Sequence, residues 1–326
     1  MTATMRAGIA TPSGLAIADV LRPTPGEHEI LVKVAAAGLN RADLNAARGA
    51  GIATSASLAK PIGMEWAGET VAVGVGVRDF APGDPVMCSG SGGYAQYAVA
   101  DHGRCFKLPA GFDLTQAAVL PMALLTAHDA ISTNGGFTRG ESILVHGASS
   151  GVGLMALKMA RYLGAASIVG TSTHDGRRAR LADFGATLAI DPRTEKWPEQ
   201  VLAATGGRGA DVVIDLVSGA GFNQLMQAAA IRGRLVNIGR LGGVRAEFDF
   251  DLHALRRLTY IGVTFRTRSL AEIREINRKV QVDLWPGIAA GELSLPVDRT
   301  FALADAPAAH EHMRANGHFG KIALKL

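Results

Sequence analysis

The sequence predicts an α/β protein with two domains. One is rich in β-strands, and in the other strands alternate with helices around a parallel sheet. Residues up to about 120 form short apolar runs broken by turns, whereas strand and helix patterns alternate from about Pro121 onward. A small-residue turn at 147–153 joins an apolar strand to a helix, as a βαβ unit requires. The chain has 326 residues, 48% of them hydrophobic, which is more than one core usually serves.

The β-rich domain is predicted from apolar runs bounded by Gly, Pro and Asp. The expected elements that belong to it are strands over 30–36 and 69–74, a turn at 82–85 that enters a third strand, a helix over 270–287, and strands over 295–301 and 321–326. The predicted domains are therefore 1–122, which is β-rich, 123–263, in which strands and helices alternate, and 264–326, which rejoins the first.

The alternating domain is predicted from five apolar strands separated by helix-length segments. These strands are expected over 143–146, 166–171, 188–191, 212–215 and 234–239. Because strands that alternate with helices pair in parallel, the pattern indicates a doubly wound sheet of the Rossmann type.

The turn after the first of these strands suits a dinucleotide pyrophosphate. Gly147, Gly151 and Gly153 allow a tight turn and a close approach to phosphate, and the amides that open the next helix supply an anion site. An ordinary glycine turn is the alternative. We favour the nucleotide site because the next strand arrives after one helix length.

The residues after the second strand indicate NADP(H) rather than NAD(H). An NAD site usually has Asp or Glu about 20 residues after the glycines. Here the strand ends in the hydroxyls of 171–173, and basic residues follow at 177–180, which suits a 2′-phosphate. We expect Asp175 to cap a helix that begins near Gly176. A solvated helix face is the alternative for the arginines, of which Arg177 is the one expected to bind.

Composition excludes several other classes. The 33 basic residues are scattered among 29 acidic ones, the net charge is +4 and only 6% of residues are aromatic, so a nucleic-acid partner is not expected. No apolar run spans a bilayer and the N-terminal residues lack the core of a secretory signal, which predicts a cytoplasmic protein. Cys88 and Cys105 are too few for a disulfide framework and are expected to be reduced and packed.

Six short motifs accompany the glycine turn along the chain. They are Gly38-Leu39-Asn40-Arg41-Ala42-Asp43, Gly63-Met64-Glu65, 80–86 (Phe-Ala-Pro-Gly-Asp-Pro-Val), 93–97 (Gly-Tyr-Ala-Gln-Tyr), Leu125-Thr126-Ala127 and 320–324 (Gly-Lys-Ile-Ala-Leu). Together they resemble the medium-chain dehydrogenase/reductase family, in its zinc-independent quinone oxidoreductase branch, over essentially the full length. The resemblance implies a GroES-like β-rich domain built from both chain ends, a Rossmann domain between them, a cofactor in the cleft and, usually, a homodimer formed through the Rossmann sheets.

The resemblance also implies chemistry without a metal. Zinc-dependent relatives have Cys and His where this chain has Asn40 and Met64, and neither an amide nor a thioether replaces those ligands. Asp43 and Glu65 are expected to hydrogen-bond to backbone or an Arg instead. Because no Lewis acid would stabilise an alkoxide, hydride transfer from NADPH to a quinone or an α,β-unsaturated carbonyl is the expected reaction.

The remaining site residues are likewise implied by the resemblance. Asn40 is expected beside the nicotinamide, with its amide donating to the substrate carbonyl, or else as a loop residue that fixes backbone. Thr126 is expected to contact the nicotinamide or to cap a helix. The other expected cofactor contacts are Ser149, Ser150, Gly151, Val152 and Gly153 at the pyrophosphate, Ser172, Thr173 and Arg177 at the 2′-phosphate, Val217, Ile238, Gly239 and Arg240 at strand ends, Thr264, Phe265 and Arg266 beside the nicotinamide, and Asn316 at the phosphorylated ribose.

Some positions depart from the relatives or have two interpretations. Asn45 and Pro192 stand where relatives often have Tyr, so the adenosine must be stacked by other groups. The small-residue run 48–58 predicts an open or mobile pocket mouth. Trp66 would narrow the pocket or fill the core, and core packing is expected. An Arg at 240, 266 or 268 would bind phosphate or an acidic substrate tail, or lie at the surface.

Two alternative functions stay open from the sequence. One is an enoyl-thioester reductase, as in the enoylreductase domains of polyketide synthases. The other is a non-enzymatic NADPH-binding protein with a structural or RNA-binding role, for which RNA binding would weaken with salt.

Overall fold

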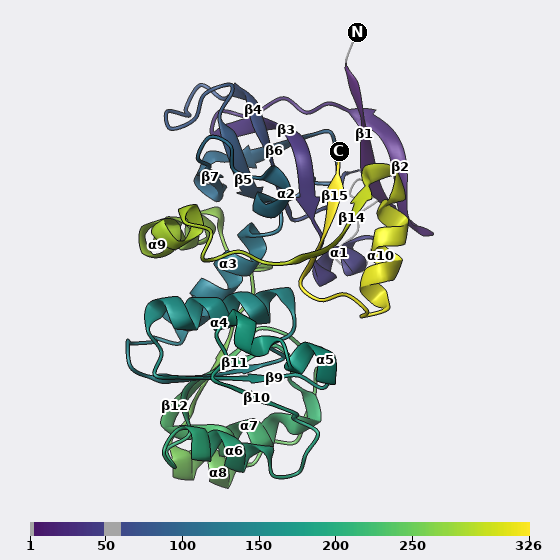
Figure 1. Cartoon of the computed structure of the whole chain (residues 1–326). Helices are drawn as coiled ribbons and strands as arrows, with labels where there is room; N and C mark the ends of the chain where they lie inside the picture. Colours follow the sequence, from purple (N-terminus) through teal and green to yellow (C-terminus); the bar gives the residue numbers. More distant parts are fainter. Residues whose placement is uncertain (1–2, 49–59) are drawn as a thin grey trace. The chain divides into compact units, whose positions relative to one another are not determined.

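The computed structural model describes residues 3–48 and 60–326 and divides the chain into two compact units (Figure 1). The first unit combines Met1–Met122, Leu270–Ala289 and Ser294–Leu326, and the second combines Ala123–Ser269 with Ala290–Leu293. Of the small-residue run at 48–58, only Arg48 lies within the described residues. No helix in the described ranges is both long enough and apolar enough to cross a membrane.

The first unit contains a β-hairpin and a seven-stranded sheet in the order β14-β15-β3-β4-β5-β7, with β6 also pairing with β3. Its strands are β1 (Thr4–Thr11), β2 (Gly14–Leu21), β3 (Glu29–Gly38), β4 (Glu65–Val73), β5 (Pro85–Ser89), β6 (Tyr97–Asp101), β7 (Cys105–Lys107), β14 (Val297–Ala302) and β15 (Lys321–Lys325). Strand β15 pairs antiparallel with β3, so residues from both chain ends form one sheet (Figure 1). This confirms the predicted architecture, although the β1–β2 hairpin was not predicted.

Helices complete the first unit. They are α1 (Arg41–Ala46), α2 (Leu114–Ala117), α9 (Leu270–Ala289) and α10 (Ala306–Arg314), and α3 (Pro121–His128) continues from it into the second unit. Trp66 is fully buried in the core of the unit, as expected, and packs in a cluster with residues of β3 and β15. Cys88 and Cys105 are free thiols, both buried, and lie opposite each other on β5 and β7.

The second unit is built on a six-stranded, entirely parallel sheet in the order β10-β9-β8-β11-β12-β13. Numbered by appearance within the unit, this is the order 3-2-1-4-5-6 of a dinucleotide-binding fold. Its strands are β8 (Ser142–His146), β9 (Ser167–Thr171), β10 (Leu188–Ile190), β11 (Ala210–Asp215), β12 (Ala229–Asn237) and β13 (Thr259–Gly262). The sequence predicted the first five of these strands but not the edge strand β13.

Helices cover both faces of this sheet. They are α4 (Gly151–Leu163), α5 (Asp175–Arg178), α6 (Trp197–Ala204), α7 (Phe222–Ala228) and α8 (Phe250–Arg256), with a π-helical turn, η2, over Asp129–Asn134. Figure 1 shows α4 on one face and α6, α7 and α8 on the other. Helix α4 is capped by Gly164, whose φ of 84° lets the amide of the next residue, Ala165, turn back to the carbonyl of Ala160.

Candidate functional site

The turn between β8 and α4 has the geometry of an anion site. Gly147 has a φ of +86°, and a Cβ there would lie 2.9 Å from Cγ2 of Val217. Ser150 caps α4, because its Oγ accepts from the Gly153 amide at 3.1 Å. The first-turn amides of a helix have no acceptor within the helix, and its N-terminus carries partial positive charge. The predicted glycine turn is therefore present at the carboxyl end of the central strand.

Close packing of α4 against this turn requires Gly153. A Cβ at Gly153 would lie 2.7 Å from the backbone of Ala148 and of Gly147. Backbone atoms cannot move aside as a side chain can, so a larger residue would push the helix away from the turn. This is the role of the third glycine in the dinucleotide fingerprint.

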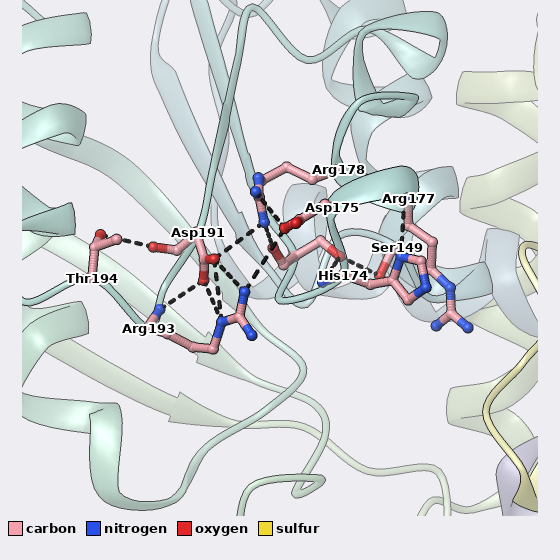
Figure 2. A network of polar contacts seen from close by, with 9 residues as sticks. Ser149, His174, Asp175, Arg177, Arg178, Asp191, Arg193 and Thr194 are labelled. Atoms are coloured by element: carbon pink, nitrogen blue, oxygen red, sulfur yellow. Dashed lines mark hydrogen bonds and ion pairs between the residues drawn. The ribbon is translucent and has the colours of Figure 1, made fainter.

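Hydroxyl groups from two strand ends meet beside the turn. The Oγ atoms of Ser172 and Ser149 are 3.0 Å apart, and Ser172 is almost fully buried. Thr173 follows as an exposed residue, and Arg177 on α5 is half-buried. Figure 2 shows the Arg177 side chain pointing away from the cluster that Asp175 forms with its neighbours. The structure thus brings the two serines together, next to the helix that carries Arg177.

The expectation for Asp175 was wrong. His174, not Asp175, is the N-cap of α5, since its Nδ1 accepts from the Arg177 amide at 3.4 Å. The helix itself begins at Asp175, one residue before the expected start. The Asp175 carboxylate pairs instead with the guanidinium of Arg178 at 2.7 Å. The nearby guanidinium gives that carboxylate a charged partner.

An ion-pair network missed by sequence reasoning joins the ends of β9 and β10 (Figure 2). Arg178 donates to the Ser172 carbonyl at 3.0 Å and lies 3.3 Å from Asp191. Arg193 donates to both carboxylate oxygens of Asp191, the shorter contact being 2.6 Å. These hydrogen bonds from Arg193 hold the pKa of the Asp191 carboxyl well below its usual range. Arg178 is therefore engaged by the carboxylates of Asp175 and Asp191.

A buried carboxylate orders the ends of β11 and β12. Asp215 is fully buried and accepts from the amides of Val217 and Ser218, both at 2.9 Å. Gly239 follows β12, and a Cβ there would lie 2.2 Å from the Leu216 carbonyl oxygen. The carboxyl ends of the parallel strands therefore hold the glycine turn together with Val217, Ile238 and Gly239. Arg240, which follows them, is exposed.

The other candidates of the second unit have varied environments. Thr126 lies within α3 and is nearly buried, so it does not cap that helix. Arg266 donates its amide to Oγ1 of Thr264 at 3.2 Å, and Phe265 between them is half-buried. Arg268 pairs with the buried Asp129 at 2.6 Å. That ion pair gives Arg268 a structural partner within the same unit.

In the first unit, Asn40 lies in a buried charged cluster. Its Nδ2 donates to Oε1 of Glu65 at 2.9 Å, and its Oδ1 accepts from Nζ of Lys321 at 2.8 Å. Lys321 also donates to Oε1 of Glu65 at 2.6 Å, and the Met122 amide donates to Oε2 at 2.8 Å. We call Asn40, Glu65 and Lys321 the Asn40 cluster. Backbone binding by Glu65 was expected, but its charged partner is a Lys rather than an Arg.

Asp43 is buried directly beside this cluster. Its Oδ2 accepts from the Asn40 amide at 2.8 Å and from the Tyr94 hydroxyl at 3.1 Å. Burial raises the pKa of the Asp43 carboxyl to about 7. The Tyr94 ring lies edge-on to His310, with centroids 5.8 Å apart. Burial lowers the pKa of His310 to about 4, so this imidazole is neutral at neutral pH.

Asn316 lies near the C-terminal end of this unit, after α10. Its Oδ1 accepts from the guanidinium of Arg41, and its backbone has a φ of 55°. Asn tolerates this left-handed conformation better than most residues, which accounts for its place in the turn.

The donor set around Glu65 does not suit zinc. Both carboxylate oxygens of Glu65 already accept hydrogen bonds, and Asn40 and Met64 occupy the adjacent positions. Within residues 3–48 and 60–326, no group of three or more His, Cys, Asp or Glu is placed to hold a metal ion. Tetrahedral zinc requires such a group.

A parallel sheet in this order, with an anion-binding turn at its central strand, defines a dinucleotide-binding unit, here accompanied by a β-rich unit. Residues 26–110 match the family model described as "Alcohol dehydrogenase GroES-like domain", and residues 151–281 match "Zinc-binding dehydrogenase".

Known proteins resemble the chain over nearly its whole length. Human quinone oxidoreductase is 30% identical over 317 residues, which covers 94% of this chain and 92% of the human protein. The phthioceranic/hydroxyphthioceranic acid synthase of Mycobacterium tuberculosis is 31% identical over 327 residues, or 99% of this chain but 15% of the synthase. The structure of Escherichia coli quinone oxidoreductase complexed with NADPH superposes with a TM-score of 0.85 and 26% identity, covering 99% of this chain and all of the other.

The chain therefore belongs to the medium-chain dehydrogenase/reductase family of oxidoreductases, in its quinone oxidoreductase group.

Proposed function

We propose that this protein is an NADPH-dependent, zinc-free reductase that transfers hydride to a quinone or an α,β-unsaturated carbonyl. The observation that carries the proposal is the anion-binding turn before α4, with Ser172 and Arg177 beside it. The Escherichia coli relative crystallised with NADPH supports the choice of cofactor. We take the first unit to bind the acceptor and the second to supply most of the NADPH contacts.

NADPH would be held mainly by backbone amides and short hydroxyl side chains. Residues 149–153 would bind the pyrophosphate, because the turn and the start of α4 provide amides and positive dipole. Ser172, Thr173 and Arg177 would bind the 2′-phosphate, since a phosphate monoester needs several donors and a positive charge. Val217, Ile238, Gly239 and Arg240 would line the cofactor at strand ends, with Thr126, Thr264, Phe265 and Arg266 at the nicotinamide and Asn316 at the ribose.

The chemistry proposed needs little from the protein beyond orientation. Bound NADPH supplies the hydride, and a conjugated acceptor delocalises the negative charge that develops on its oxygen. Water or a weakly acidic group of the pocket then supplies the proton that completes the reduction. A single hydrogen bond from the Asn40 amide would polarise that oxygen. Zinc is not required for this role, and the Glu65 carboxylate beside Asn40 is already occupied by donors.

An enoyl thioester is the second candidate acceptor. The match to a mycobacterial acid synthase favours it, because 99% of this chain corresponds to a segment that makes up 15% of the synthase. A segment of that size would be one domain of the synthase, like the enoylreductase domains considered above. The β-carbon of an enoyl thioester accepts hydride in the same way as that of an enone.

We further propose that the protein forms a homodimer through β13. This strand lies at the edge of the parallel sheet, and exposed apolar residues gather on the elements around it. They are Ile231, Val244, Phe250, Leu255 and Tyr260. Tyr260→Lys is expected to convert a dimer to a monomer in sedimentation velocity, whereas Val282→Lys on α9 should not. A wild-type monomer, or a variant that stays dimeric, would contradict this interface.

The deciding experiment for the reaction is oxidation of NADPH and, in parallel, NADH with a panel of acceptors. The panel contains a benzoquinone, an ortho-naphthoquinone, a 2-alkenal, an enone and crotonyl-CoA, each with and without a chelator. We expect chelator-resistant turnover that prefers NADPH, with the best acceptor choosing between quinone and enoyl chemistry. Turnover that the chelator abolishes, or none with any acceptor, would overturn the proposal.

A further inference from the structure

The side-chain amide of Asn40 can take only one orientation in its surroundings. An ammonium group only donates hydrogen bonds, and a carboxylate only accepts them. Lys321 lies 2.8 Å from Oδ1 and Glu65 lies 2.9 Å from Nδ2. A rotated amide would place its oxygen against the carboxylate and its NH2 against the ammonium, losing both hydrogen bonds. The assignment of oxygen and nitrogen therefore follows from chemistry rather than from the coordinates alone.

We propose that Lys321 and Glu65 are positioning residues that fix the Asn40 amide and direct one of its hydrogens to the acceptor carbonyl. This inference rests on the proposed function, in which Asn40 binds the acceptor. Nδ2 carries two hydrogens. Among the described residues, only Glu65 accepts a hydrogen bond from Nδ2, so the second hydrogen is available to a ligand. Asn40 is half-buried rather than enclosed, which leaves room for that contact.

The cluster is rigidly built. Glu65 is fully buried and Lys321 is 6% exposed, so water competes little with their contacts. Gly38 makes room for the carboxylate, since a Cβ at that position would lie 2.4 Å from Oε1 of Glu65. The backbone amide of Asn40 is held separately by Asp43. Both the main chain and the side chain of Asn40 are thus fixed before an acceptor arrives, which is what preorganised catalysis requires.

Lys321 is also expected to strengthen the donor. A cation that withdraws electron density from Oδ1 makes the N–H groups of the same amide more acidic, as in any polarised chain of hydrogen bonds. Glu65 balances the charge, so the cluster as a whole does not repel the negative charge that develops on the acceptor oxygen. A contribution to stability would explain this buried ion pair less well than a role in positioning Asn40. Well-packed apolar residues often stabilise a core as much as a buried ion pair does.

The test is a double-mutant cycle between Lys321→Met and Asn40→Ala, with three readouts for each protein. These are kcat and KM for the best acceptor of the panel, the Kd for NADPH, and the midpoint of thermal unfolding. We expect Lys321→Met to lower kcat/KM about ten- to hundredfold while the Kd for NADPH changes less than about twofold. In the Asn40→Ala background the same change should cost less than about twofold, because residues that act as a unit are not additive.

Two further variants separate positioning from folding. Lys321→Met leaves the Glu65 charge buried without its cation, which can unfold the unit. The double variant Glu65→Gln/Lys321→Met removes both charges, and it should stay folded with the same loss of kcat/KM. Lys107→Met is the matched control, since Lys107 pairs with Asp84 at the surface of the same unit. It should leave all three readouts unchanged.

The outcomes distinguish this inference from the function on which it rests. Losses from Lys321→Met and Asn40→Ala that simply multiply would overturn the positioning role, and so would a folded Glu65→Gln/Lys321→Met protein with unchanged kcat/KM. In either case wild-type turnover would leave the proposed reductase intact. If none of the acceptors in the panel supports NADPH oxidation by the wild-type protein, the proposed function is overturned, and this inference with it.

Discussion

Replacing Asp43 with Asn is expected to change how the stability of the protein depends on pH. The carboxyl is almost fully buried, and burial raises its pKa from the ordinary 3.8 to about 7. Between these two pH values the Asp43 carboxyl therefore keeps its proton in the folded protein and loses it in the unfolded chain. A raised folded pKa gives stability that is fully present below pH 3.8 and is lost as the pH rises through about 7. Asn cannot titrate, yet it retains an oxygen for the Asn40 amide.

The size of the effect follows from the difference between the two pKa values. It is about three units, and each unit is worth about 1.4 kcal/mol. The free energy of unfolding of the wild type should thus fall by about 4 kcal/mol, relative to Asp43→Asn, between pH 4 and pH 8. His310 contributes in the opposite sense. Its pKa is lowered to about 4, so the stability that the neutral imidazole gives to the folded protein is lost as the pH falls through that value. That contribution is common to both proteins and cancels in the comparison.

Urea unfolding at several pH values measures this difference. Trp66 and Trp285 lie in the first unit and Trp197 in the second, so fluorescence in a Trp197→Phe background reports on the first unit. The control is Asp79→Asn, which changes an exposed carboxyl of the same unit. A difference between wild type and Asp43→Asn that does not vary from pH 4 to pH 8 would refute the reasoning.

Two further predictions concern the second unit. Arg177→Ala should raise the Kd for NADPH about ten- to hundredfold, the value of a charged hydrogen bond, and leave the Kd for NADH within about twofold. The matched change Arg180→Ala should affect neither Kd. Equal losses of affinity for both cofactors would remove Arg177 from the 2′-phosphate site. Gly153→Ala should weaken NADPH binding at least about tenfold and lower stability by about 1–3 kcal/mol, because its Cβ would lie 2.7 Å from backbone. Gly221→Ala, whose Cβ would have Oε1 of Gln224 as its nearest neighbour at 3.9 Å, is the control for thermal unfolding and titration. An unperturbed Gly153→Ala protein would show that α4 can shift freely.

Local patterns predicted most of the parallel sheet and the glycine turn. Strands such as β8 and β11 are buried on both faces, so their apolar runs are continuous and easy to recognise. The hairpin β1–β2 and the edge strand β13 were missed for the opposite reason. Most residues of β2 are only half-buried, and β13 has two exposed residues at its start, so neither shows a clear apolar period.

The charged contacts of the site were not predictable from spacing. Lys321 and Glu65 are separated by 256 residues, and Arg268 and Asp129 by 139. No local pattern records such a pairing, since it depends on which strands become neighbours. The error at Asp175 has a related cause. A cap was expected from the residue type, but Arg178 on the same helix and Arg193 in the turn after β10 both pair with that carboxylate.

The position of Lys321 has a consequence for how the chain matures on the ribosome. Glu65 is made early, yet the cation that balances it is added 256 residues later. At ordinary rates of synthesis this delay is on the order of tens of seconds. Ala123–Ser269 has then been completely translated, so the parallel sheet can assemble while the β-rich unit still lacks β15. A carboxylate buried without its partner would be costly, so the nascent β-rich unit must keep Glu65 hydrated until its last strand arrives.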